Sequence, residues 1–191
     1  MLAFSPYISS FIDQIIVSIP YFMPELTLIV TFIGTILASL FIDKHWKHTS
    51  FVITLIGLLL SGCYLVGEGL SKVEATGFFD MIHIDAFAVA ARLIMLLSTM
   101  LICIFIQQRQ QVRPLGDLYA VLLTATLGLN LLTMSSNWLM IFIAVETVSI
   151  SSYIMVGYFS TTKVQSEAAL KYVLFGSICA AVMLYGLSLL Y

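Results

Sequence analysis

Charged residues are scarce in this chain. Of its 191 residues only 9% are Asp, Glu, Lys or Arg, whereas 61% are hydrophobic and the mean hydropathy is +1.07. Soluble domains carry about 25% charged residues, because their surface must be compatible with water. The composition therefore excludes a soluble enzyme. Eight Lys and Arg residues against ten Asp and Glu leave no basic surface, which also excludes a nucleic-acid-binding protein.

Motifs for metals and cofactors are also missing. Cys63, Cys103 and Cys179 stand singly in apolar runs, without C-x-x-C or metal-ligand spacing, and are expected to be small packing residues. The sequence has no glycine-rich nucleotide motif, P-loop, H-E-x-x-H or c-type haem motif. His45 and His48 lie in a charged segment with no third ligand nearby. We therefore expect neither a metal nor a redox cofactor in this chain.

Long apolar runs, by contrast, are abundant. A membrane-spanning helix needs about 20 mostly apolar residues, and these runs lack the alternation of barrel strands. The predicted fold is therefore an all-α integral membrane protein with six transmembrane helices. The qualifying segments are 24–42, 49–66, 85–106, 118–136, 138–159 and 168–191.

The basic residues predict the orientation in the membrane. Five of them lie in the segments 43–48, 107–117 and 160–167, and only Lys72 lies in a connecting segment on the other side. Basic loops are cytoplasmic, so the N-terminus is predicted to be outside. Residues 1–23 have helically spaced apolar side chains and no basic signal-peptide start, which predicts a short interfacial segment.

Glu146 is the most informative ionisable residue within the predicted spans. It lies about 12 Å into the fifth span, near mid-membrane, where a charge is costly and often marks an ion pathway. Ser149 and Tyr153 follow on the same helix face, so the stripe has the groups needed to hold water and relay protons. The alternative is a structural carboxylate that neighbouring hydroxyls satisfy or that stays protonated.

Lys171 begins the sixth span, with Glu167 four residues before it, which favours a helical ion pair near the interface. Its depth differs from that of Glu146 by about 14 Å, so a direct salt bridge between them is not expected. On the fourth span Thr126 and Asn130 form a polar line that is predicted to face the Glu146 stripe, or else only to pack between helices.

Two other charged residues have structural interpretations. Arg92 lies seven residues after Asp85, on the same helix face, so the two are predicted to pair near the outer interface. Glu25 follows Pro24 at the start of the first span, where a carboxylate complements the helix dipole.

Several segments together resemble a known family. They include Met23-Pro-Glu-Leu, His83-Ile-Asp-Ala-Phe, Gly116-Asp-Leu-Tyr-Ala, the stretch from Asn137 to Tyr153 around Glu146, and Ser166-Glu-Ala-Ala-Leu-Lys-Tyr. The order of these segments and the residues in them are similar to those of subunit N of the proton-pumping NADH:quinone oxidoreductase, respiratory complex I. The P-E-L opening favours subunit N over the related subunits L and M and the Mrp antiporters.

The resemblance implies an antiporter-like subunit of a bacterial inner membrane. Residues 24–117 would form the leading helices and residues 118–191 the beginning of the proton-translocating domain. Glu146 matches a glutamate that modulates a lysine on the family's broken seventh helix, and Lys171 matches the lysine at the start of the family's sixth helix. Both residues are therefore expected to take part in proton translocation. NADH, FMN, iron–sulfur clusters and quinone would be bound by other subunits, and the partners would be the membrane subunits M, A, J and K and the lipid bilayer.

Such subunits have about fourteen helices, whereas this chain stops in its sixth span. We therefore expect a fragment or a split gene product that does not complete a proton path by itself. Two alternatives remain: an Mrp-type cation/proton antiporter subunit, and a non-conducting assembly or scaffold protein in which buried charges only specify helix pairing.

Overall fold

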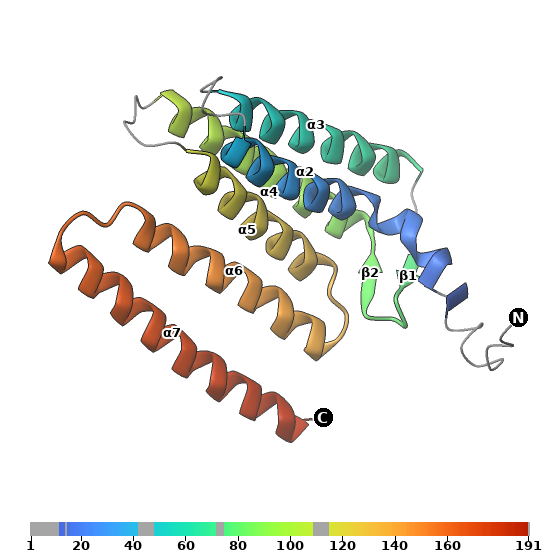
Figure 1. Cartoon of the computed structure of the whole chain (residues 1–191). Helices are drawn as coiled ribbons and strands as arrows, with labels where there is room; N and C mark the ends of the chain where they lie inside the picture. The colour runs from blue at the N-terminus through green and yellow to red at the C-terminus, as the bar shows by residue number, and fades with distance from the viewer. Residues whose placement is uncertain (1–11, 14, 42–47, 72–74, 109–114, 191) are drawn as a thin grey trace, which may run out of the picture.

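The six predicted spans are present as helices. The structure is a computed structural model, and it describes residues 12–13, 15–41, 48–71, 75–108 and 115–190. Six helices are long and apolar enough to cross a membrane, so the chain is a multi-pass membrane protein. The long helices shown in Figure 1 are α2 (Met23–Phe41), α3 (Thr49–Leu70), α4 (Ala86–Gln108), α5 (Gly116–Met134), α6 (Trp138–Tyr158) and α7 (Lys163–Leu190).

Local signals set several helix ends. Asp85 caps α4, because its Oδ1 accepts a hydrogen bond of 2.7 Å from the Ala88 N–H. Asn137 does the same for α6, where its side chain accepts from the Leu139 N–H at 3.0 Å. Residues 135–137 form the short turn between α5 and α6.

The first span begins earlier than predicted. Helical residues from Ile15 lead through the short 3₁₀ helix η1 (Ile19–Phe22) directly into α2, and the apolar stretch runs from Ile15 to Phe41. Proline in the first turn of η1 needs no backbone partner, so it does not stop the chain from continuing into α2. The described part of the expected interfacial segment is thus an extension of the first span; residues 1–11 and 14 lie outside the described residues.

A hydrophobic core lies among α2, α3, α4 and α5. Leucines from all four helices meet there, with Cys103 and Tyr119. The burial of Cys103 agrees with its predicted packing role. α5 packs on α2, α3, α4 and α6, whereas α7 lies at the edge and packs mainly on α6 (Figure 1). α7 has no buried residue.

A short β-hairpin, which the sequence analysis did not predict, closes one end of the bundle. Strands β1 (Ala75–Gly77) and β2 (Ile82–Ile84) pair antiparallel, with Thr76 opposite His83. The turn places three non-glycine residues, 78–80, at positive φ, a conformation that needs support from its surroundings.

The hairpin is fixed to its neighbours on both sides. The Phe78 N–H donates to Ser18 Oγ at 3.1 Å, and the Ser136 N–H donates to the Met81 carbonyl at 2.9 Å. Ile82 is 1% exposed and packs with Met134 at the end of α5. The hairpin therefore joins the start of the first span to the α5–α6 turn at one end of the bundle.

Polar contacts also join the helices at the opposite end. Ser39 Oγ donates to Asp117 Oδ1 at 3.0 Å, and Tyr119 Oη donates to Gln107 Oε1 at 2.7 Å. The end of α2, the end of α4 and the start of α5 therefore lie together. This arrangement agrees with the alternating topology predicted from the loop charges.

Candidate functional site

Glu146 lies in the third turn of α6 and is half-buried. Ser149 and Tyr153, on the same face by helical periodicity, are also half-buried. No ion pair to Glu146 is found among the described residues. The carboxylate thus lies within a spanning helix without a charged partner in this part of the chain.

The Glu146 face of α6 turns towards α7 at Tyr153. The Tyr153 ring meets the Tyr172 ring edge-on with centroids 4.9 Å apart, and the Ser152 and Tyr172 hydroxyl oxygens are 3.0 Å apart. A Cβ added at Gly176 would overlap the Tyr153 hydroxyl. Glycine at this position therefore lets the phenol lie directly against the α7 backbone.

Lys171 lies on α7 and is largely exposed. Its Nζ is 2.7 Å from Glu167 Oε1, four residues earlier, and 62% of the lysine side chain is exposed. The predicted i,i+4 pair is therefore present, and Lys171 does not contact Glu146 in this structure.

Of the two predictions for the polar line on α5, packing between helices is the one seen at Thr126. The Thr126 and Thr99 hydroxyl oxygens are 2.8 Å apart, so Thr126 faces α4. The surface that α5 offers to α6 is instead Gly128, where an added Cβ would meet Thr147 and Val148. Helix α6 therefore contacts α5 where α5 lacks a side chain, and Thr124, one turn earlier on the same face of α5, lines a groove together with Thr147 and Ser151 of α6.

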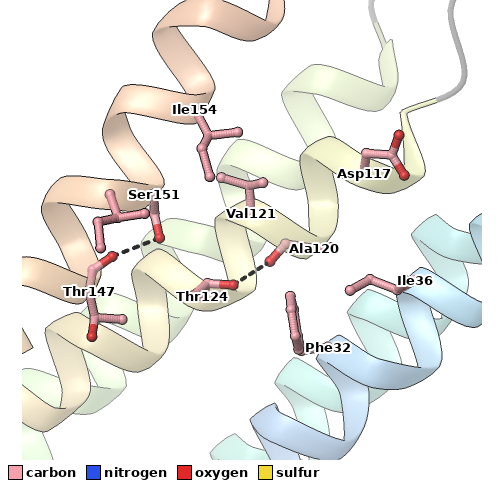
Figure 2. Close-up of a pocket in the computed structure, with 10 residues that line it drawn as sticks. Phe32, Ile36, Asp117, Ala120, Val121, Thr124, Thr147, Ser151 and Ile154 are labelled. Carbon is pink, nitrogen blue, oxygen red and sulfur yellow. Dashed lines mark hydrogen bonds between the residues drawn. The ribbon is translucent and has the colours of Figure 1, made fainter. Parts of the chain in front are cut away.

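An apolar groove of about 490 Å³ lies among α2, α5 and α6 (Figure 2). Its hydroxyls bond within their own helices: Thr147 Oγ1 donates to the Ile143 carbonyl, Ser151 Oγ to the Thr147 carbonyl, and Thr124 Oγ1 to the Ala120 carbonyl. The groove therefore presents little free polarity along its walls. Glu146 is not among its lining residues, so the groove is separate from the polar stripe.

A buried ion-pair cluster joins the first three long helices. Arg92 of α4 places Nη1 3.1 Å from Glu25 Oε1 and Nη2 2.9 Å from Glu68 Oε2. The side chains of Arg92 and Glu25 are fully buried, and that of Glu68 is 12% exposed. These three residues are named the guanidinium cluster below.

The guanidinium cluster corrects two predictions. Arg92 does not pair with Asp85, because the Asp85 carboxylate is occupied as the cap of α4. Glu25 does lie in the first turn of α2, as expected, but it is a fully buried partner of Arg92 and not a surface cap. Glu68 was missed, because it lies just beyond the predicted second span. Glu68 could have been found from its depth, because it is a carboxylate on the preceding helix at a depth similar to that of Arg92.

Four buried polar atoms have no hydrogen-bond partner in the described part of the chain. They are Glu25 Oε2, Arg92 Nε, and both side-chain polar atoms of Asn130. Asn130 is fully buried on α5, as a residue of the predicted polar line.

Comparison with known proteins finds a matching family model and similar proteins. The family model described as NADH:quinone oxidoreductase/Mrp antiporter, TM matches residues 135–191, which include Glu146 and Lys171. NADH-quinone oxidoreductase subunit N of Chlorobium chlorochromatii is 31% identical over 188 residues, which are 96% of this chain. The chain is thus similar to this family at residues 135–191, and similar to subunit N along nearly its whole length.

Relatives from cyanobacteria give similar values. NAD(P)H-quinone oxidoreductase subunit 2 of Prochlorococcus marinus (strain NATL2A) is 38% identical over 172 residues, which are 88% of this chain. The chain covers 36% and 33% of these two relatives. It therefore spans about a third of the length of the curated relatives that it matches.

Solved structures share the arrangement of helices. A chain of respiratory complex I from Thermus thermophilus aligns with a TM-score of 0.70 and 27% identity, over 88% of this chain and 36% of that chain. A chain of the membrane-bound sulfane sulfur reductase, an archaeal respiratory membrane complex, aligns with a TM-score of 0.71 and 20% identity, over 87% and 37%. The second likeness concerns the fold alone.

Proposed function

We propose that this chain acts as part of a membrane-arm subunit of NADH:quinone oxidoreductase and takes part in proton translocation. The observation that carries the proposal is similarity along nearly the whole chain to curated subunits of that enzyme, together with the fold match to complex I. The half-buried carboxylate of Glu146 in a spanning helix supports it, because such a group can bind and release a proton within the membrane.

In this proposal Glu146 carries the proton, and Ser149 and Tyr153 support it. Their stripe lies on the side of α6 that meets α7 at Tyr153, and polar groups on one helix face can order water for proton transfer. Lys171 would take part from α7, the second helix of this pair, where it forms an ion pair with Glu167. Thr126 is left out of the path, because it faces α4.

The proposal assigns the redox chemistry to other subunits. NADH, FMN, iron–sulfur clusters and quinone would be bound there, and this chain would contribute only membrane helices, in a bacterial inner membrane. The partners would be the neighbouring membrane subunits, among them M, A, J and K. Large exposed side chains on α7, such as Leu170, Phe175, Ile178 and Val182, support lipid or protein contacts along that helix.

The test replaces Glu146 by Gln in the complete subunit within its native complex. Gln keeps the shape of the side chain but cannot exchange a proton, so we expect NADH-driven acidification of inverted membrane vesicles to fall severalfold. Asp80→Asn is the matched control, because it neutralises an exposed carboxylate on the hairpin turn and should leave pumping unchanged. Unchanged pumping in Glu146→Gln at saturating NADH would contradict the proposal.

The same variants separate the alternatives. The family description also covers Mrp antiporters, and a chain of that kind would support sodium/proton exchange without NADH. In a scaffold, Glu146→Gln would lower the amount of assembled complex while each assembled complex kept its normal pumping. Pumping is therefore expressed per assembled complex, which is quantified by native gel electrophoresis.

A further inference from the structure

The guanidinium cluster has one positive and two negative groups when all three are ionised. Glu25 and Arg92 are fully buried, and Glu68 is 12% exposed. A net negative charge in a low-dielectric interior is strongly unfavourable, so a second positive charge is needed to balance the cluster. A proton on one carboxyl group does this without any further side chain.

Glu68 is the carboxyl that is better suited to hold the proton. It lies in the last turn of α3, which ends at Leu70, so the carbonyl ends of that helix disfavour a negative charge there. Its Oε2 accepts from Arg92 Nη2, which leaves Oε1 to carry the hydrogen. A protonated Glu68 still accepts the bond from Arg92, and Glu25 then forms the single ion pair with the guanidinium.

Two polar atoms of Glu25 and Arg92 are suited to bind a water molecule. The pair is joined by one hydrogen bond, from Nη1 to Oε1, while Arg92 Nε and Glu25 Oε2 have no partner among the residues that the structure describes. One of these atoms is a donor and the other an acceptor, on residues that already touch. A water that accepts from Nε and donates to Oε2 satisfies both, as buried waters usually do.

We propose that the guanidinium cluster is a binding site for one exchangeable proton and one ordered water, with the proton on Glu68. Exchange occurs through Glu68, because its side chain is the only one of the three with exposed surface. α5 lies between the cluster helices and α6 (Figure 1), so this site is separate from the Glu146 stripe. The proposal does not depend on the proposed function.

The charged groups around the cluster do not provide the missing positive charge in the part of the chain that the structure describes. Asp85 is bound to the N-terminus of α4, Asp13 and Asp80 add further negative groups near the hairpin, and His83 is exposed on β2. Lys72, four residues after Glu68, lies outside the described residues.

The test is perfusion infrared spectroscopy of the complete complex at neutral pH, in which the spectrum of the wild type is compared with that of each variant. We expect a protonated-carboxyl band, equivalent to one group per complex, that is present in the wild type and lost in Glu68→Gln. Glu25→Gln should remove the same band, because Arg92 then has only Glu68 as a partner and Glu68 ionises. The control Asp80→Asn should keep the band.

Two results would overturn the proposal. One is an unchanged carboxyl band in both Glu68→Gln and Glu25→Gln, each confirmed as assembled by native gel electrophoresis. If neither variant assembles, a second measurement decides: a high-resolution cryo-EM map of the wild-type complex, which should show water density within hydrogen-bond distance of both Arg92 Nε and Glu25 Oε2. The second result that would overturn the proposal is the absence of that water density in a map that resolves other buried waters.

Discussion

The chain has two regions that differ in how they bury their side chains. In the region of α2 to α5, each helix packs on at least two others and contributes to a shared core. In the region of α6 and α7, α6 has only two fully buried residues and α7 has none. The first region is therefore a self-contained bundle, whereas the second presents most of its surface to lipid or to other helices.

The same kind of ion pair has different surroundings in the two regions. Arg92 is fully buried between Glu25, which is also fully buried, and Glu68, which is 12% exposed, while Lys171 pairs with Glu167 where both side chains are more than half exposed. A buried pair cannot lose one partner without leaving an unbalanced charge, but an exposed pair can. Ionisable residues in apolar helices thus serve to hold helices together in the first region, and remain available to other groups in the second.

The largest expected effect tests the buried pair. Arg92→Met leaves Glu25 and Glu68 without a positive partner, so we expect a loss of about 3–5 kcal/mol of stability, seen as a lower thermal midpoint in detergent and less assembled complex. Arg92→Lys is the control. It keeps the positive charge but lacks the planar fork that bonds two carboxylates at once, so its stability should lie between those of the wild type and Arg92→Met. Wild-type stability of Arg92→Met would show that the cluster does not hold the helices together.

A smaller effect is expected from helix spacing, compared across the two regions. A Cβ added at Gly57 of α3 would overlap Thr31 of α2, so Gly57→Ala should cost about 1–3 kcal/mol. Gly186 of α7 has no such neighbour within 4 Å, and Gly186→Ala should cause no loss. Thermal unfolding of both variants measures the difference. Equal losses would mean that α7 is as tightly packed in the complex as α3.

The smallest effect is expected for the exposed pair. Lys171→Gln removes the contact with Glu167, which is worth about 0–1 kcal/mol at an exposed position. The thermal midpoint should therefore hardly change, while NADH-driven pumping falls if Lys171 carries protons as proposed. A large loss of stability would indicate that Lys171 has a buried partner elsewhere in the assembled subunit.

Local sequence was sufficient for much of the fold. The six spans follow from the length of the apolar runs, and the turn before Trp138 follows from a capping asparagine. The pair between Lys171 and Glu167 could be predicted because residues four apart on a helix are neighbours in any fold. The hairpin was missed, since strands of three residues in a polar segment give too short a pattern to recognise.

Predictions across helices were less successful. Thr126 and Asn130 share one line of α5, but the sequence left open which helix that line meets, and the structure shows that Thr126 meets Thr99 of α4. The deciding residue was Gly128, which lets α6 approach from another side. Helical periodicity fixes which residues share a face, but it does not fix what that face meets.

The sequence by itself determined that the described part of this chain has six helices long and apolar enough to cross a membrane, that Glu146 lies within one of them, and that Lys171 has a partner one turn away. These properties depend on composition and on the geometry of a single helix. Only the tertiary structure decided that Arg92 pairs with Glu25 and Glu68, residues from two other helices, and not with Asp85 on its own face. The reason is physical: a buried charge is satisfied by whichever opposite charge the packing of the helices brings within about 3 Å, and that packing depends on all the side chains between them.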